Sequence, residues 1–286
     1  MRHPVITLLT DFGTGDHYVA SMKGVILGIN PRCALVDISH QVKPQDIEEG
    51  AFLLASTFSS FPRGTVHLSV VDPGVGGPRR AILVVTSHYY FIGPDNGLFT
   101  FALQREKVKQ AIVLSNRRYF LPRVSSTFHG RDLFAPVAGH LSLGVKPDAF
   151  GHRTDTWVEL SLGEPEQKGE ELRGQIRHVD GFGNLVTNID GERFLDFVRD
   201  HSFLIRVGRH AVRALKTGYW EGKKGELMAL IGSAGFLEIA LREGNAQKKL
   251  KAKKGDKVRV EIKNNLNAAF SGPVNPSSKA SDGGFR

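Results

Sequence analysis

The chain has 286 residues and a formal net charge of +9 at pH 7, from 38 Lys and Arg against 29 Asp and Glu. With 41% hydrophobic residues it can bury one large core or two medium ones, and its length favours two domains. It lacks a run of about 18 apolar residues and the pattern of a secretory signal, so we expect a cytoplasmic protein with no membrane partner. The single cysteine, Cys33, excludes an intrachain disulfide and a cysteine-cluster metal site.

The positive charge is concentrated near one end of the chain. Residues 247–263 hold eight Lys or Arg against Asp256 and Glu261. Such a run is typical of a solvated surface, and it lacks the interleaved aromatic residues of a platform for single-stranded nucleic acid. We therefore expect no nucleic-acid partner.

The first half of the chain alternates strand and helix patterns. Strands are predicted over residues 5–10, 34–38 and 65–71, and helices over 17–29 and 46–61. A β-rich stretch at 81–92, a short helix from residue 96, a strand at 111–114 and a helix after residue 129 continue this order. The alternation predicts an α/β fold with a Rossmann-like layered domain.

The second half is richer in short strands. Gly, Glu, Pro, Gln and Lys dominate the region around residues 159–171, which indicates a linker. Beyond it, six short apolar runs separated by glycines predict a small antiparallel barrel or sandwich. We therefore divide the chain into an α/β domain (1–160), a linker (161–172), a β-barrel domain (173–263) and a disordered tail (264–286).

The loop after the third predicted strand combines glycines and prolines with two opposite charges. Residues 71–80 read VDPGVGGPRR, which forbids continuation of a strand or helix. Asp72 then lies at the strand end, with Arg79 able to fold back over it, and such a pair suits binding a small anion or a water. An ordinary turn, in which Asp72 caps its own backbone, is the alternative.

Two more polar residues of the first half fall at the ends of predicted elements. Asp11 follows the first strand, at the edge where open α/β sheets bind ligands, and could accept both hydroxyls of a ribose; loop capping is the alternative. The glycines after it match neither the dinucleotide fingerprint nor a phosphate-binding loop. His129 precedes a helix, and because none of the eleven histidines has metal-ligand spacing, we predict no metal. A structural, hydrogen-bonded role for His129 is the alternative.

In the second half, residues 178–188 and 231–240 join strands through glycine turns that carry polar side chains. The first turn holds Asp180 and Asn184, and the second holds Ser233 shortly before Glu238. Simple turn chemistry could account for them. Tyr219 offers an aromatic face, for which barrel packing is the alternative.

Seven ordered motifs, spread between residues 5 and 262, resemble those of the S-adenosyl-L-methionine (SAM) hydroxide adenosyltransferases, relatives of fluorinase and chlorinase. They are 10–13 (TDFG), 46–50 (DIEEG), 72–76 (DPGVG), 94–98 (PDNGL), 127–132 (TFHGRD), 182–184 (FGN) with 187–188 (TN), and 237–240 (LEIA). The resemblance implies a larger α/β domain, a smaller β-barrel domain, and a homotrimer whose sites lie between the large domain of one subunit and the small domain of its neighbour.

The resemblance also implies the reaction. Water or hydroxide attacks the 5′ carbon of SAM and gives adenosine and L-methionine, so SAM is the substrate and no cofactor is expected. Asp72, Arg79 and His129 are the implied catalytic residues: Arg79 stabilises the developing hydroxide, and Asp72 or His129 takes the proton.

The substrate-binding residues come from the same resemblance. They are Asp11 for the ribose diol, Asn184 for the adenine edge, Asp180 for the methionine ammonium, Ser233 for its carboxylate, Phe128 and Tyr219 as stacking faces for adenine, and Glu238 close to the site. Ala234 stands where the fluorinase has an arginine, which weakens the carboxylate contact.

Two other functions remain open at this point. The halide-using relatives carry Tyr at the positions of Asp72 and His129 and lack the arginine, so these three polar residues favour water over a halide as the nucleophile. A non-catalytic adenosine- or nucleic-acid-binding protein would use the basic run instead, and its affinity would fall steeply with salt.

Overall fold

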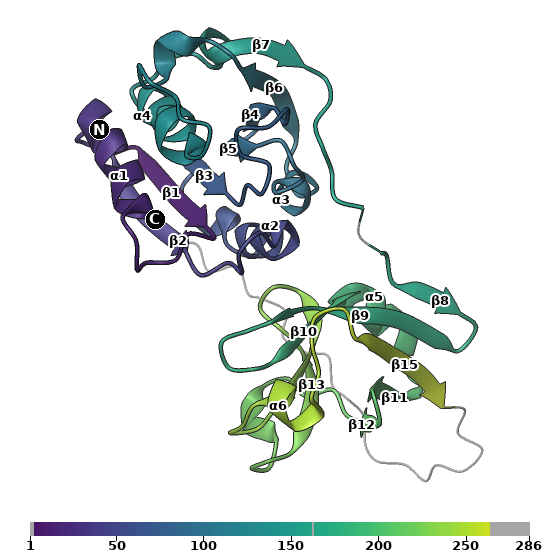
Figure 1. Cartoon of the computed structure of the whole chain (residues 1–286). Helices are drawn as coiled ribbons and strands as arrows, with labels where there is room; N and C mark the ends of the chain where they lie inside the picture. The colour runs from purple at the N-terminus through teal and green to yellow at the C-terminus, as the bar shows by residue number, and fades with distance from the viewer. Residues whose placement is uncertain (1–2, 162, 264–286) are drawn as a thin grey trace, which may run out of the picture. The chain divides into compact units, whose positions relative to one another are not determined.

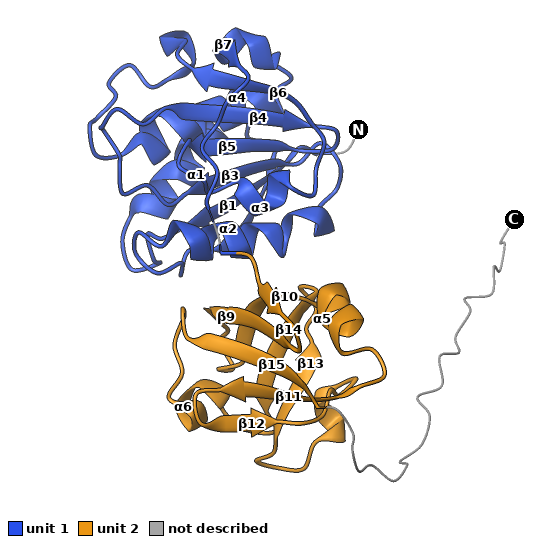
Figure 2. Cartoon of the chain, turned by 90° about the vertical axis from the view of Figure 1, so that its right-hand side faces the viewer, with its two compact units in different colours: residues 1–163 blue, residues 164–286 orange. Residues whose placement is uncertain are grey.

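The computed structural model describes residues 3–161 and 163–263, and the chain divides into two compact units, Met1–Gly163 and Glu164–Arg286 (Figure 2). The region predicted as a linker, 161–172, includes residues that belong to β-strands. It contains strand β8 (Glu166–Lys168), which pairs with the start of β9 (Glu171–Val179). Because all three residues of β8 are exposed, their polar composition resembles that of a linker. The predicted tail, 264–286, lies outside the described residues.

The larger unit is built on a seven-stranded mixed sheet. In spatial order its strands are β2 (Ala34–Ser39), β1 (Val5–Thr10), β3 (Val66–Val70), β5 (Tyr90–Pro94), β4 (Ala81–Thr86), β6 (Val108–Leu114) and β7 (Gly151–Thr154). The first four are mutually parallel, and the last three pair antiparallel. The β-rich stretch at 81–92 is therefore a hairpin of two strands.

Helices cover both faces of this sheet (Figure 1). Helices α1 (Tyr18–Ile29) and α4 (Ala135–Ser142) share one apolar core with inward residues of β1 and β3. Helices α2 (Ile47–Ala55) and α3 (Thr100–Leu103) pack in the core on the other face. Asp46 starts α2 by accepting a hydrogen bond from the backbone of Glu49 at 2.9 Å. The helix predicted over 46–61 ends at Ala55, and a 3₁₀ turn, η1 (Phe58–Ser60), follows.

The smaller unit is an antiparallel, nearly closed barrel-like sheet. In spatial order its strands are β12 (His210–Val212), β11 (Ser202–Val207), β15 (Lys257–Lys263), β9, β10 (Leu185–Asp190), β14 (Phe236–Leu241) and β13 (Leu227–Ile231). A bridge between Leu215 and Ala229 connects the two ends of this order. The predicted fold class, α/β with a small β-barrel, is confirmed.

Two helices of the smaller unit were not predicted: α5 (Gly191–Val198) and α6 (Ala246–Leu250). Both are short, and each begins at a polar cap residue, Asp190 and Asn245 respectively. Helix α5 buries Phe194 and Phe197 in the core of the unit. Elements of eight and five residues are too short to show a clear helical period in the sequence, and tertiary packing decides their conformation.

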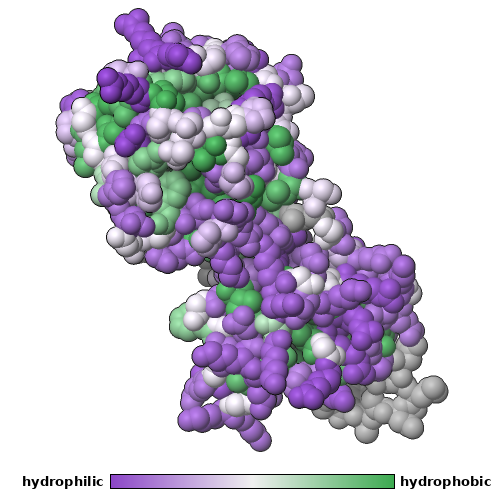
Figure 3. Space-filling model, in the orientation of Figure 1, coloured by the Kyte–Doolittle hydropathy of each residue, from purple (hydrophilic) through white to green (hydrophobic). Residues whose placement is uncertain are grey.

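The surface of the smaller unit is mostly hydrophilic on the face drawn in Figure 3. Lys248, Lys249, Lys251 and Lys253 are exposed on and just after α6. None of the helices in the described residues combines the length and apolar character needed to cross a membrane.

Candidate active site

Two parallel strands of the larger unit, β1 and β3, end at one edge of its sheet, and a polar residue follows each of them there. Asp11 comes directly after β1, and Asp72 lies two residues beyond β3, the parallel neighbour of β1. One oxygen of Asp11, Oδ2, accepts a hydrogen bond at 2.8 Å from the backbone of Gln45. Asp11 thus holds the loop before α2, in which Gln45 has a left-handed φ of 67°.

Asp72, Arg79 and His129 are in direct contact. The Nε of Arg79 lies 2.9 and 3.1 Å from the two carboxylate oxygens of Asp72, and its Nη2 also donates to Oδ2. The same Nη2 lies 2.8 Å from Nδ1 of His129. The side chains of Arg79 and Asp72 are only 12% and 4% exposed, so this ion pair is shielded from water.

The glycine loop reaches His129 because of close backbone packing. Gly76 has a φ of 75°, and a side chain there would collide with the backbone carbonyl of Ser126, three residues before His129. On the other side, Asn96 donates from Nδ2 to the carbonyl of Val71 at 2.8 Å, which fixes the end of the preceding strand. Glycine at position 76 therefore lets two segments 50 residues apart bring their side chains together.

The segment that carries His129 is held by a fully buried carboxylate. His129 precedes a turn of π-helix, η3 (Gly130–Phe134), a form often found at functional sites. Asp132 in this turn accepts hydrogen bonds from the backbone of Ser125 at 2.8 Å and from Nε of Arg131 at 2.6 Å. The loop before His129 is thus tied to the helix after it.

Phe128, predicted as a stacking face, lies in an aromatic cluster. Its ring is 7% exposed and contacts Phe12 and Tyr18 at centroid distances of 5.9 and 5.1 Å. The guanidinium of Arg131 lies over it at 4.9 Å. These contacts leave little of the Phe128 ring open to a ligand.

The hydrogen bond from Arg79 determines the protonation state of His129. An arginine only donates, so Nδ1 accepts, and the neutral imidazole carries its proton on Nε2. Burial lowers the pKa of His129, and the charge of Arg79 lowers it further, while Asp72 and Asp132 oppose this more weakly. His129 is therefore a neutral hydrogen-bond donor at pH 7.

A second group of predicted residues lies in the smaller unit, around the turn between β9 and β10. Asp180 accepts hydrogen bonds on Oδ1 from the backbones of Phe182 and Asn184, at 2.9 and 2.8 Å. Its other oxygen accepts from Nδ2 of Asn184 at 3.0 Å. The carboxylate thus shapes its own turn, as the alternative interpretation expected, and also orients the Asn184 amide.

Tyr219 and Glu238 extend this group. The hydroxyl of Tyr219 donates to Oε1 of Glu238 at 2.5 Å and lies 3.5 Å from Nδ2 of Asn184. Burial, followed by this contact with Glu238, raises the pKa of Tyr219 far above its ordinary value. Burial also raises the pKa of Glu238. Ser233 lies in the exposed turn between β13 and β14, outside these hydrogen bonds.

Two aromatic residues beside this group were not predicted as site residues. Phe182 is 80% exposed and Trp220 is 76% exposed. Phe182 stands between two glycines in a polar turn, where a ring has no core to enter, and that pattern was available in the sequence. Exposed aromatic rings beside buried polar groups are typical of a surface that a ligand or partner covers.

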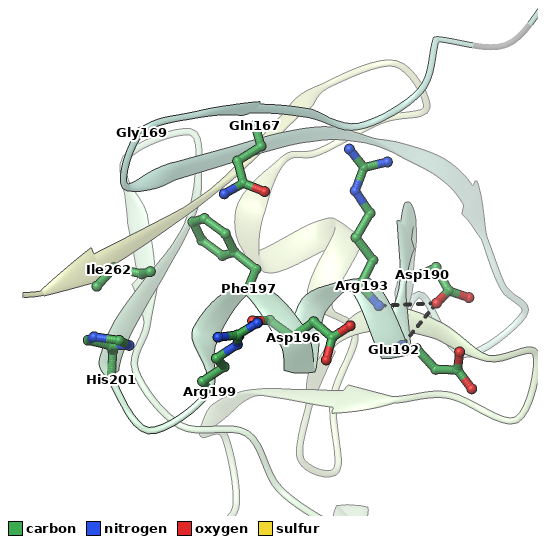
Figure 4. A pocket seen from close by; sticks show the side chains of 10 residues that line it. All are labelled: Gln167, Gly169, Asp190, Glu192, Arg193, Asp196, Phe197, Arg199, His201 and Ile262. Atoms are coloured by element: carbon green, nitrogen blue, oxygen red, sulfur yellow. Dashed lines mark hydrogen bonds between the residues drawn. The ribbon is translucent and has the colours of Figure 1, made fainter.

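A separate cleft of about 720 Å³ lies beside α5 in the same unit (Figure 4). Its lining includes Arg193, Phe197, Arg199 and His201 and none of the predicted site residues. In the described ranges, 3–161 and 163–263, His, Cys, Asp and Glu nowhere form a group of three that could hold a metal ion.

Both units match models of known protein families. The model of the SAM hydroxide adenosyltransferase N-terminal domain matches residues 6–151, and that of the C-terminal domain matches residues 174–259. The chain belongs to the SAM hydroxide adenosyltransferase family. The resemblance drawn from the motifs is confirmed.

Individual relatives in this family match over most of the chain. An (R)-S-adenosyl-L-methionine hydrolase of Methanocaldococcus jannaschii is 37% identical and covers 90% of this chain and 95% of its own. A fluorinase of Nocardia brasiliensis is 26% identical, with 91% and 98% covered. The crystal structure of an uncharacterized conserved protein from Thermotoga maritima superposes with a TM-score of 0.84 at 38% identity, covering 89% of this chain and 99% of that one.

Proposed function

We propose that this protein hydrolyses SAM to adenosine and L-methionine by attack of water or hydroxide on the 5′ carbon. The observation that carries the proposal is the contact of Asp72, Arg79 and His129 at the edge of the sheet. It is supported by the greater identity to a relative named as a SAM hydrolase than to one named as a fluorinase.

The chemistry requires little beyond an oriented water. Methionine leaves SAM as a neutral thioether, so the leaving group needs no general acid. As the C5′–O bond forms and the C5′–S bond breaks, the water loses one proton. The site must therefore supply a hydrogen-bond acceptor for that proton and a fixed position for the oxygen.

We assign these roles to Asp72, Arg79 and His129. His129 carries its proton on Nε2 and donates a hydrogen bond to the water oxygen, since its Nδ1 is occupied by Arg79. Asp72 is an acceptor only, so it accepts the hydrogen bond from the water and then the proton. Arg79 holds both side chains and stabilises the developing hydroxide. We therefore propose Asp72, rather than His129, as the proton acceptor.

Substrate binding is assigned to the remaining predicted residues. Asp11 accepts from the ribose diol, Asn184 contacts the adenine edge, and Asp180 and Ser233 bind the methionine part. In place of Phe128, we assign adenine stacking to the exposed rings of Phe182 and Tyr219.

The two groups of residues belong to different units, and the assembly we propose joins them. In a homotrimer, the large unit of one subunit supplies Asp72, Arg79, His129 and Asp11, and the small unit of its neighbour supplies the rest. The highly exposed Phe182 and Trp220 support a covered surface on the small unit. We place the protein in the cytoplasm, without a cofactor.

The test is incubation of the purified protein with SAM, followed by chromatography. Adenosine and methionine are expected in equal amounts, and in H₂¹⁸O the label enters the 5′ hydroxyl of adenosine. The formation of 5′-chloro-5′-deoxyadenosine in chloride, or the absence of any product, would contradict the proposal. Added salt is expected to change SAM binding little, unlike the binding of a polyanion to the basic run.

A further inference from the structure

Within the smaller unit, Glu238, Tyr219, Asn184 and Asp180 form a chain of hydrogen bonds with a fixed direction. Tyr219 has one hydroxyl proton and donates it to Glu238 at 2.5 Å. Toward Asn184 the tyrosine oxygen is therefore an acceptor, and the carboxylate of Asp180 is an acceptor as well. Because both partners accept, the NH₂ end of the Asn184 amide must face them.

The carbonyl end of the Asn184 amide then points away from these partners. Among residues 3–161 and 163–263, none donates a hydrogen bond to this oxygen, Oδ1. Asn184 Oδ1 is also not one of the fully buried side-chain atoms that lack a hydrogen-bond partner. The turn thus leaves one oriented acceptor atom on Asn184, a residue that is 6% exposed and lies two positions after the exposed Phe182.

The position of Glu238 is itself tightly constrained. It lies in β14 between β13 and β10, opposite Leu230 and Val186, and is 7% exposed. A Cβ at position 232 would lie 2.6 Å from its Oε2, so a larger residue there would require the Glu238 carboxylate to shift. Burial is costly for a carboxylate, and it raises the pKa of Glu238.

We propose that Glu238 is a positioning residue that, through Tyr219, keeps Oδ1 of Asn184 turned toward the purine and so selects a 6-amino purine over a 6-oxo purine. This inference rests on the proposed function for the identity of the ligand. The 6-amino group of adenine donates to Oδ1, whereas the 6-oxo group of hypoxanthine places a second acceptor against it. We expect discrimination of about 10- to 100-fold in kcat/KM.

The experiment compares SAM with its deaminated analogue, S-inosyl-L-methionine, in steady-state hydrolysis. Glu238→Leu and Tyr219→Phe are expected to reduce the selectivity about fivefold or more, through KM for SAM with kcat changed less than about threefold. Glu238→Gln keeps an oxygen that accepts from Tyr219, so it should retain most of the selectivity. Glu261→Leu, a strand glutamate of the same unit that pairs with Arg206, is the matched control.

Gly232→Ala serves as a second variant, because it keeps Glu238 and only displaces its carboxylate; it should behave as Glu238→Leu does, with folding checked by thermal unfolding. The inference would be overturned if these variants still hydrolysed SAM and kept the parental preference for SAM over S-inosyl-L-methionine: Glu238→Leu, Tyr219→Phe and Gly232→Ala. The proposed function would then remain intact. If the parent does not hydrolyse SAM, the proposed function fails. The binding of adenosine and inosine, measured by calorimetry, then decides the inference alone: equal affinity for the two nucleosides overturns it.

Discussion

At the scale of single residues, Arg79 does two things at once. Its contacts to Asp72 fix the position of a carboxylate that is 4% exposed, and its contact to Nδ1 of His129 selects one tautomer of the ring. In the mechanism we propose, Asp72 and His129 then offer one acceptor and one donor to the attacking water. A lysine could not replace this planar fork, since a single ammonium cannot match both partners in the same geometry.

Removing either end of this arrangement should separate binding from turnover. We expect Asp72→Ala and His129→Ala to bind SAM with a Kd within about threefold of the parent and to lose about 10²- to 10⁴-fold in kcat. Asp11→Ala should instead weaken SAM binding, because the ribose loses its acceptor. Calorimetry with SAM and single-turnover product analysis check both parts. Parental turnover by Asp72→Ala would refute its role.

The tautomer assignment makes a prediction about pH. The pKa of His129 is lowered by burial and by Arg79, so the ring is neutral at pH 7, and activity should fall only as acid protonates it below pH 6.5. In Arg79→Leu the guanidinium is lost while Asp72 and Asp132 remain, so the pKa of His129 should rise. Titration of the His129 ring protons by NMR measures this without turnover. An unchanged or lower pKa in the variant would contradict the assignment.

At the scale of elements, the site depends on loops that are fastened at both ends. Asn96 holds the strand that precedes the glycine loop, and Asp132 holds the segment that carries His129. Gly76 is where the two segments touch. The geometry of the candidate site thus relies on a close backbone contact more than on any long helix or strand.

Gly76→Ala should therefore damage the site. Its positive φ and the approach of the Ser126 carbonyl require the loop to shift, which should cost about 1–3 kcal/mol of stability and reduce kcat at least about tenfold. Gly15→Ala, in open space and without a positive φ, is the matched control. Thermal unfolding and turnover measure the two effects. Equal behaviour of the two variants would show that the contact does not position Arg79.

At the scale of the whole molecule, the candidate residues are shared between two units, each with its own core. Because of this division, the oligomeric state determines whether the two groups of candidate residues can form one site. If the units that cooperate belong to different copies, a single chain has no complete site.

Mixing two inactive variants tests this sharing. Co-expressed Asp72→Ala and Asn184→Ala chains should regain about a quarter of the parental activity, since a random trimer combines an intact large unit with an intact small unit at that frequency. Light scattering after size exclusion gives the assembly size. A monomer, or no regained activity, would contradict sites between subunits.

The core of the larger unit also carries a titratable group. His67 in β3 is fully buried among aromatic rings, accepts or donates one hydrogen bond with Thr7, and has its pKa lowered by burial to about 3. In the unfolded chain the His67 pKa is near 6.5, so between pH 6.5 and 3 the unfolded state binds more protons than the folded state. The free energy of unfolding is therefore highest above pH 6.5 and falls as the pH is lowered toward 3. His67→Gln should reduce this pH dependence by up to about 1.4 kcal/mol per pH unit. Chemical unfolding at several pH values measures the difference, and identical slopes would argue against it.

Local sequence patterns determined much of the fold and of the site's membership. The apolar runs at 5–10 and 65–71 became β1 and β3, because strands buried on both faces need such continuous runs. Helix α5 was missed because eight residues give too short a pattern to separate helix from strand. Asp72, Arg79 and His129 were selected from motifs that are linear in the chain.

Only the tertiary structure decided how these residues meet. The contact between Arg79 and His129 joins positions 50 apart, and the chain from Glu238 through Tyr219 to Asn184 joins a strand, a 3₁₀ turn and a glycine turn. Local propensity does not encode such distances. Packing between segments remote in the chain determines three features: the tautomer of His129, the orientation of the Asn184 amide and the burial of Phe128. The sequence therefore identified the candidate residues, whereas only the folded structure shows which of their atoms interact.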